Sequence, residues 1–393
     1  MKKNKNAYDI YVFHRSYFCG KMLAYLRYKG IPFNPIYGSL AEYGDEIANN
    51  TGLRQMPVIK TPDNIWLQDT TPMIDWFEAR YPKHGLLPRD PVTAFLTRLL
   101  EDYADEWMWR PAIYYRWMHA EDRKLYKTMF VKEFLGGAWG WGGPSTWLAG
   151  KLVHKHQRDK FLYGDGMTEH NREHVESIYI NTLDRLEAIF QQQPYLLGDK
   201  PCLADFGFFG SMFWHFGNDP TSNRIMQERA PAVYEWTARL WNMKPEKADG
   251  MEFNVNDGVP FGWEPLLKDI CENYLPYLEL NAINFDKGHK TFDLSSEGYL
   301  YPKVNTSPYR VYCRERLQSF LNAMSLDDQK KVQHILQSFG GWKPLTSHSY
   351  IKSMWDPEGI APLCTPKPIS SWEKFKAHFT GSNHIQTLRA WNR

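Results

Sequence analysis

The chain has 393 residues, 43% of them hydrophobic, and a formal net charge of +2 at pH 7. Because a typical domain has roughly 100–200 residues, this length predicts two or three domains with real cores. The near-neutral charge argues against nucleic acid as a partner. The sequence has no run of about 18 apolar residues, so we expect no membrane-spanning segment.

The cysteines and the first residues bear on the cellular compartment. The basic start at residues 1–6 is followed by no apolar segment, so we expect no signal peptide. The five cysteines are odd in number and widely spaced, which favours a reducing compartment over a disulfide framework. No cluster of Cys and His has metal-ligand spacing. We therefore expect a cytoplasmic protein without a metal site.

Residues 8–82 predict a small α/β unit. Gly30 closes the first helical pattern, as a glycine after a helix end does. Residues 62–64 supply turn chemistry between two apolar runs and predict a hairpin. Pro72 fits the first turn of a helix that stops before Pro82. The predicted order is strand, helix, strand, helix, a two-stranded hairpin and a last helix.

A helical period dominates residues 92–245. It extends over some thirty positions after residue 92, where Pro111 should kink or split the helix. A Gly- and Trp-rich break follows at residues 133–147. Helical patterns then return in three segments, at residues 168–193, 202–217 and 223–243.

Residues 246–393 have a weaker pattern. Only 308–324 and 326–339 predict convincing helices, the second with Ser325 as N-cap and acidic residues in its first turn. Elsewhere we expect ordered loops. Four tryptophans are expected to anchor them: Trp263, Trp342, Trp355 and Trp372.

Pro57 opens the third predicted strand, opposite the turn that follows the first. This is the arrangement of a thioredoxin-like fold. If the Met56–Pro57 bond is cis, the Met56 backbone can pair with a peptide-like ligand outside the sheet. The alternative is a trans proline at the first position of an edge strand. Taken alone, Pro57 favours that alternative.

Asp69 and Thr70 change this balance. They place an acid and a hydroxyl at the start of a helix, directly after a strand. The free N–H groups of the helix attract a carboxylate, which Thr70 can also bind, while Asp69 can accept from an ammonium group. This pair suits the α-amino-acid end of a ligand. Ordinary capping explains either residue alone, but less easily both together with Pro57.

Four segments in this order resemble the cytosolic glutathione transferases: residues 16–33, 54–61, 67–82 and 195–210. The last resembles the family's capping box, in which Asp205 would bond back to the N-cap backbone. Cys202 stands there in place of the usual Ser or Thr.

The resemblance runs from residue 8 to about residue 245. It implies an α/β thioredoxin-like domain at residues 1–83, an all-helical domain at residues 92–245 and a homodimer. It does not account for residues 246–393, which we expect to form a mostly irregular and helical C-terminal extension.

The resemblance also implies roles in binding glutathione. The Met56 backbone, before Pro57, would hold the cysteinyl part, and Asp69 and Thr70 would bind the γ-glutamyl end. The glycyl end would contact two neighbouring side chains, Gln55 and Arg54.

Ser16 is the expected catalytic residue. Ser16, Phe18 and Lys21 fit the Ser-x-Phe-x-x-Lys/Arg pattern of serine-type members, which implies that the Ser16 hydroxyl donates to the glutathione sulfur. A free thiol titrates near ~8.5 and is mostly protonated at neutral pH. A hydrogen-bond donor and a helix N-terminus both lower the pKa of a thiol and so favour the thiolate, which is the nucleophile.

Two nearby side chains are alternatives to Ser16. Cys19 matches the second cysteine of a thioredoxin motif, where a lone thiol has a packing role or a redox role. Tyr17 is a weaker candidate as hydroxyl donor.

Aromatic residues on the helix after residue 92 are candidates for a second-substrate pocket. They include Trp107, Tyr114 and Tyr115. An aromatic stripe at helical spacing is also typical of a core. If they line a pocket, they indicate a large apolar or aromatic electrophile.

Three functions follow. The leading hypothesis is a glutathione transferase that activates the thiol of glutathione, its co-substrate, for attack on an electrophile, as in detoxification. The second is a glutathione-dependent thiol oxidoreductase working through Cys19. The third is a non-catalytic scaffold, for which residues 246–393 are the main argument.

Overall fold

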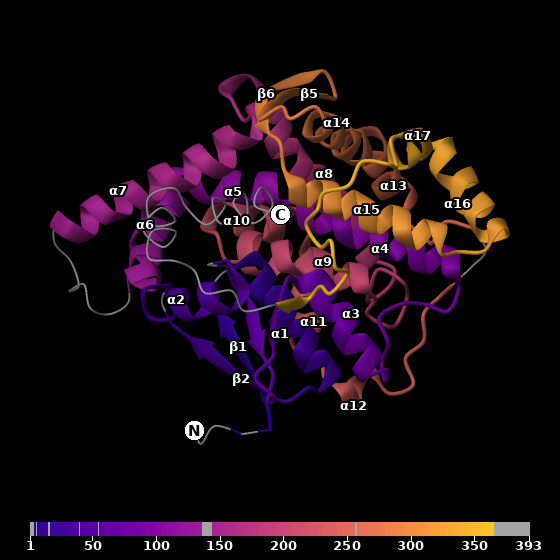
Figure 1. Cartoon of the computed structure of the whole chain (residues 1–393), viewed down its shortest axis with the longest axis horizontal. Coiled ribbons are helices and arrows are strands. Elements are labelled where there is room, and N and C mark those ends of the chain that lie inside the picture. The colour runs from indigo at the N-terminus through magenta and orange to yellow at the C-terminus, as the bar shows by residue number, and fades with distance from the viewer. Residues whose placement is uncertain are drawn as a thin grey trace. The chain divides into compact units, whose positions relative to one another are not determined.

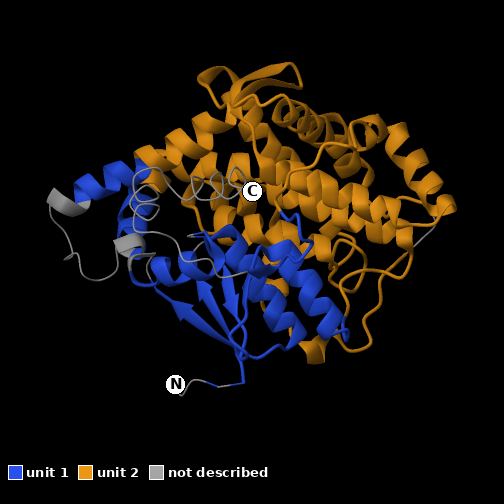
Figure 2. Ribbon diagram, in the orientation of Figure 1, with its two compact units in different colours: residues 1–84, 124–154, 356–393 blue, residues 85–123, 155–355 orange. Residues whose placement is uncertain are grey.

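The structure is a computed structural model that describes residues 4, 6–14, 16–38, 40–53, 55–135, 144–255 and 258–364. The chain forms two compact units, which Figure 2 colours separately. Unit 1 comprises residues 1–84, 124–154 and 356–393, and unit 2 comprises residues 85–123 and 155–355. The expected division at residues 83 and 245 stays a prediction. Arg54, Trp372 and most of the Gly- and Trp-rich break lie outside the described residues.

Unit 1 confirms the predicted order of strands and helices (Figure 1). Its first elements are β1 (Tyr8–Val12), α1 (Tyr17–Lys29), β2 (Phe33–Tyr37), α2 (Leu40–Thr51), β3 (Val58–Lys60), β4 (Trp66–Gln68) and α3 (Thr70–Arg80). Two helices belong to it in part: α6 (Ala120–Leu135) and α7 (Pro144–Gln157).

A five-stranded sheet in the order β2-β1-β3-β4-β7 forms the centre of unit 1. Strand β1 is parallel to β2, and β3, β4 and β7 (Leu363–Cys364) continue the sheet with antiparallel pairs. Ile10 lies opposite Ile59, and both side chains are fully buried. The fifth strand comes from the far end of the described chain, and the sequence did not predict it.

Local signals explain the boundaries of these elements. Gly30 has φ 66° and its N–H donates to carbonyls of the last turn of α1, so it is the predicted C-terminal cap. In the β3–β4 hairpin, Asn64 takes the positive φ that the turn needs. Helix α3 ends at Arg80, before Pro82, as predicted.

Unit 2 is mostly helical, and Pro111 marks its first break. The long predicted helix divides into α4 (Pro91–Glu106) and α5 (Trp109–Met118), with Pro111 in the first turn of α5, where proline is tolerated. The next elements are η2 (Arg158–Leu162), η3 (Tyr163–Asp165), η4 (Glu169–Asn171), α8 (Arg172–Phe190), α9 (Leu203–Ser211), η5 (Met212–Phe216), α10 (Pro220–Arg229), α11 (Pro231–Trp241) and α12 (Pro245–Ala248).

The expectation of loops between residues 246 and 307 is wrong. This segment forms α13 (Glu264–Asp269), η6 (Ile270–Tyr274), α14 (Leu275–Asp286) and the hairpin of β5 (Thr291–Ser296) and β6 (Tyr299–Asn305). The π-helical η6 lies between α13 and α14 and shifts the spacing of the apolar residues from one helix to the next. A search for a constant 3.6-residue period therefore does not detect them. Two positive-φ residues, Glu297 and Gly298, close the hairpin.

The two helices predicted for the extension are confirmed as α15 (Pro308–Asn322) and α16 (Leu326–Ser338), followed by α17 (Trp342–Thr346). Ser325 caps α16 by accepting from the Asp328 N–H at 3.2 Å. No helix among the described residues is both long and apolar enough to cross a membrane.

Residues 246–355 pack against the helices of unit 2. The Tyr103 hydroxyl donates to Asp269 at 2.7 Å, and the Tyr274 hydroxyl donates to Asp102 at 2.6 Å. These bonds join α4 to η6 and its neighbour α13. This part of the extension is therefore integral to the unit rather than a separate appendage.

Candidate functional site

Ser16 is the N-cap residue of α1, with the extended backbone (φ −80°, ψ 126°) typical of that position. Its carbonyl accepts from the Gly20 N–H at 3.0 Å. Its hydroxyl accepts no capping hydrogen bond from the helix. The hydroxyl is half-buried and bonds instead to the sulfur of Cys19.

Cys19 lies one turn into α1 and is fully buried. The Phe13 backbone N–H donates to its sulfur at 3.4 Å. Burial raises the pKa of the Cys19 thiol to about 12, against the effect of its two hydrogen bonds. A thiol with this pKa stays protonated at neutral pH, so the environment favours packing over redox chemistry.

The start of α3 carries the second group of candidates. Asp69 is the N-cap residue with φ 80°, a region that non-glycine residues adopt infrequently. Thr70, the first helical residue, is buried. Such a backbone conformation costs on the order of 1–3 kcal/mol and is often found at functional sites.

Lys21 connects the two helix starts. Its side chain is fully buried in α1, and its ammonium donates to the Thr71 hydroxyl of α3 at 3.4 Å. This contact joins the second turn of α1 to the first turn of α3. Ser16 begins one of these helices and Asp69 caps the other.

The loop before β3 supplies the third group. The Met56–Pro57 bond is cis. Gln55 is exposed, and its carbonyl accepts from the Gln68 side chain at 3.0 Å. Met56 is half-buried against the cluster that contains Tyr11 and Trp66. All described glutathione-binding candidates therefore lie in unit 1.

Sequence reasoning missed His14, in the turn that leads to Ser16. The His14 N–H donates to Glu133 at 2.6 Å, its Nδ1 lies 2.9 Å from the same oxygen, and its ring stacks on Tyr37. Glu133 belongs to α6, so no local signal could have paired them. Tyr17, the weaker alternative to Ser16, is buried against Phe18.

The aromatic candidates after residue 92 are buried in unit 2. The Trp107 ring packs 5.7 Å from that of Tyr277, and Tyr115 packs 5.1 Å from Tyr179. The Tyr114 hydroxyl donates to Glu176. These contacts favour the core alternative for all three residues.

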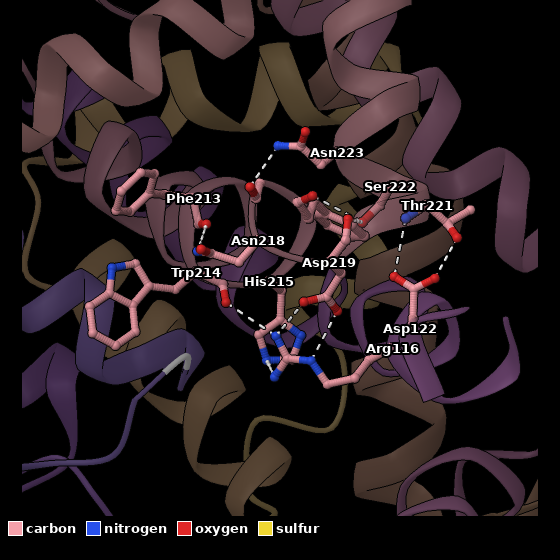
Figure 3. Close-up of polar contacts among 12 residues, drawn as sticks. Arg116, Asp122, Phe213, Trp214, His215, Asn218, Asp219, Thr221, Ser222 and Asn223 are labelled. Atoms are coloured by element: carbon pink, nitrogen blue, oxygen red, sulfur yellow. Dashed lines mark hydrogen bonds and ion pairs between the residues drawn. The ribbon is translucent and has the colours of Figure 1, made fainter. Parts of the chain in front are cut away.

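A second polar cluster lies around Arg116 in unit 2 (Figure 3). The guanidinium bonds to Asp219, to the His215 ring and to the Trp214 carbonyl. Burial, reinforced by the Arg116 charge, holds the pKa of His215 well below its usual value. The neutral imidazole and the paired ions make this a structural network. Among the described residues, no group of three or more His, Cys, Asp or Glu could hold a metal ion.

Two family models match the chain. The N-terminal domain of glutathione S-transferase matches residues 10–85, and the C-terminal domain of glutathione S-transferase matches residues 153–243. Comparison with curated proteins gave no match.

Solved structures with a similar fold include three bacterial proteins. A glutathione S-transferase from Methylobacterium radiotolerans, in complex with glutathione sulfonate, is 16% identical, with 64% of this chain and 99% of that chain covered and a TM-score of 0.38. The β-etherase of Sphingobium sp. strain SYK-6 is 17% identical, with coverages of 61% and 97% and a TM-score of 0.42. A glutathione transferase homologue from Sulfitobacter with bound glutathione is 14% identical, with coverages of 60% and 93% and a TM-score of 0.37.

The two family models match in the order that the fold requires, one on the α/β unit and one on the helices that follow. The capping box of α9 is also present, with the Cys202 N–H donating to Asp205 at 2.9 Å. This chain belongs to the glutathione transferase superfamily.

Proposed function

We propose that this protein is a glutathione-dependent transferase in which Ser16 activates the glutathione thiol. The Met56 backbone would hold the cysteinyl part of glutathione. Asp69 and Thr70 would receive the ammonium and carboxylate of its γ-glutamyl end. Gln55 and Arg54 would lie near the glycyl end.

The contact between Lys21 and Thr71, at 3.4 Å, carries this proposal. It joins the N-terminal half of α1 to the first turn of α3, which supports placing the Ser16 hydroxyl and the Asp69–Thr70 pair at two neighbouring helix starts of unit 1. A ligand that places a carboxylate and an ammonium at α3 and a thiol at α1 satisfies both helix starts. Glutathione has these groups.

The chemistry follows from the thiolate. The proton of the bound thiol leaves to solvent, because the Ser16 hydroxyl and the N-terminus of α1 both stabilise the sulfur anion. The thiolate attacks an electrophilic carbon and forms a C–S bond, and the leaving group departs with the electron pair. No protein base is needed for this step.

The finer features stay predictions of the sequence. They are an apolar or aromatic electrophile, a role in detoxification, a homodimer and a cytoplasmic location. Burial of Trp107, Tyr114 and Tyr115 gives them no support as pocket residues.

The test is an ultraviolet titration of bound glutathione with wild type, Ser16→Ala and Ser16→Thr. In wild type, the pKa of the bound glutathione thiol should lie well below the value of ~8.5 that a free thiol has. In Ser16→Ala, the ratio of thiolate to thiol in bound glutathione at neutral pH should fall at least about tenfold. The reason is that one charge-assisted hydrogen bond is worth roughly 1.5–3 kcal/mol. Ser16→Thr, which keeps a hydroxyl, should retain part of the signal.

Two results would contradict the proposal. Glutathione that binds to wild type without a thiolate signal at neutral pH would remove the activation step. Failure of wild type to bind immobilised glutathione at all would favour a non-catalytic scaffold.

A further inference from the structure

The far C-terminal part of the described chain completes the sheet of unit 1. Strand β7 pairs with β4, with Cys364 opposite Trp66 and Leu363 opposite Leu67. The Gln68 N–H extends this ladder by donating to the Pro362 carbonyl at 3.1 Å. In Figure 1 this strand is the yellow arrow beside the indigo sheet. Without it, β4 would present unpaired backbone groups as an edge strand.

Residues 356–364, named here the C-terminal segment, have a defined turn that presents β7. The Asp356 carboxylate accepts from the Ile360 N–H at 2.9 Å and from the Ala361 N–H at 3.1 Å. The Leu363 N–H donates to the Ile360 carbonyl at 2.8 Å. These bonds fix the position of the Pro362 carbonyl that Gln68 reaches.

Gln68 bonds in two directions. Its backbone N–H holds the C-terminal segment, while its side-chain amide donates to the Gln55 carbonyl at 3.0 Å. Gln55 is followed by Met56, and Gln68 is followed by Asp69. One residue therefore connects the C-terminal segment, the loop before β3 and the start of α3.

Hydrophobic packing makes the same connection. Met56 and Cys364 are both half-buried, and both pack against the core cluster of unit 1 that includes Trp66. Since Cys364 also pairs with Trp66 in the ladder, displacement of β7 would expose the cluster that supports Met56.

We propose that the C-terminal segment is a structural part of the glutathione site and that Gln68 is its positioning residue. Through Gln68, residues 356–364 hold Gln55 and Met56 in the conformation that pairs with the cysteinyl backbone of glutathione. This rests on the proposed function. Met56 would bind through its backbone, and ordering one residue costs roughly 1–2 kcal/mol, so a loop held in advance binds more tightly.

The first experiment measures glutathione affinity by calorimetry in full-length variants. Gln68→Leu removes the bond to Gln55 and should weaken binding about five- to tenfold, the range of one net hydrogen bond. Gln193→Leu is its matched control, because that side chain also donates to a carbonyl at 3.0 Å, but in unit 2. The glutathione affinity of Gln193→Leu should equal that of wild type.

A second pair of variants acts from the C-terminal segment. Bonded and non-bonded pairs alternate in an antiparallel ladder, so the bond from Gln68 to Pro362 makes Cys364 and Trp66 a bonded pair. Cys364→Pro removes the backbone N–H of residue 364, which this pair uses, and should weaken glutathione binding about as much as Gln68→Leu does. Cys364→Ala keeps the N–H and should have a much smaller effect.

Backbone NMR chemical shifts, measured without any ligand, separate this inference from the proposed function. In Gln68→Leu and Cys364→Pro the backbone shifts of Gln55 and Met56 should move away from their wild-type values, whereas in Cys364→Ala they should stay close to them. If wild type does not bind glutathione, the proposed function fails, and the chemical shifts alone decide the coupling. Unchanged shifts of Gln55 and Met56 in both Gln68→Leu and Cys364→Pro overturn the inference, as does unchanged affinity where wild type binds.

Discussion

Arg116 donates to both carboxylate oxygens of Asp219, at 2.9 Å from Nε and 2.8 Å from Nη2, and both side chains are buried (Figure 3). Arg116 Nη1 also lies 2.8 Å from Nε2 of the His215 ring, and Nη2 donates to the Trp214 carbonyl at 3.1 Å. This bidentate pair ties α5 to the turn between η5 and α10. Its ions are desolvated, so each depends on the other for stability.

Replacing Arg116 by Met should therefore destabilise unit 2 strongly. The substitution leaves the Asp219 carboxylate buried without its cation, which costs on the order of 3–5 kcal/mol. The measurement is the free energy of unfolding in urea. Arg224→Met is the matched control, because its ion pair with Glu121 is exposed and should contribute less than about 1 kcal/mol. Equal effects of the two variants would contradict a structural role for the buried pair.

Asp69→Asn should weaken glutathione binding without unfolding unit 1. Asparagine tolerates the positive φ of this position, so the backbone is kept and only the charge is lost. A hydrogen bond between charged groups is worth about 1.5–3 kcal/mol, which predicts a loss of affinity of roughly 10- to 100-fold. Calorimetry measures it. Asp63→Asn, an exposed acid in the β3–β4 turn, should bind as wild type does.

The elements of unit 1 were predictable because their signals are local. Gly30 ends α1, Asn64 helps form the hairpin turn, and Pro72 fits the first turn of α3, each through the dihedral angles of its own backbone. The capping box at Cys202 and Asp205 was predictable for the same reason, since its two residues are three positions apart.

The fifth strand and the positioning role of Gln68 depend on contacts that no local pattern contains. Strand β7 has two residues and pairs with β4 almost three hundred positions earlier. The Gln68 side chain reaches a backbone carbonyl, which every residue type supplies. The hairpin of β5 and β6 escaped prediction although Glu297 and Gly298 supply its turn, because a register shift between Phe292 and Leu294 and the irregular burial of β6, which contains Pro302, interrupt the alternation of apolar residues.

Cys19 should resist alkylation in the native protein. Its thiol is fully buried and its pKa is raised to about 12, so between pH 7 and pH 9 almost no thiolate forms and iodoacetamide labelling should not increase with pH. The half-buried Cys364 should react first. Mass spectrometry of digested protein assigns the labelled sites.

The same residue tests the oxidoreductase alternative. Cys19→Ala should retain the thiolate signal of bound glutathione, because the Ser16 hydroxyl loses only its bond to the Cys19 sulfur and can still donate to the sulfur of glutathione. Loss of glutathione-dependent activity in this variant, or native labelling of Cys19 as fast as that of Cys364, would favour the redox function.

Asp205 should make stability depend on pH in the mildly acidic range. Its carboxylate is fully buried, which raises its pKa from 3.8 to about 6 even though N–H groups of Cys202, Leu196 and Trp236 donate to it. The folded state then takes up a proton near pH 6, whereas the unfolded chain does so near pH 4. The contribution of this group to the free energy of unfolding therefore increases as the pH falls through 6, and it decreases as the pH rises.

Between pH 7 and pH 5 this gain should amount to about 1 kcal/mol, and the full difference of about 3 kcal/mol is approached only below about pH 3, where the unfolded chain is protonated as well. Urea unfolding of wild type and Asp205→Asn at both pH values measures it, because the asparagine variant lacks the titrating group and serves as the reference. Wild type should gain stability relative to the variant on acidification. A relative loss would mean that the three N–H donors outweigh burial and lower the pKa, so that the capping box depends on an ionised Asp205 throughout this range.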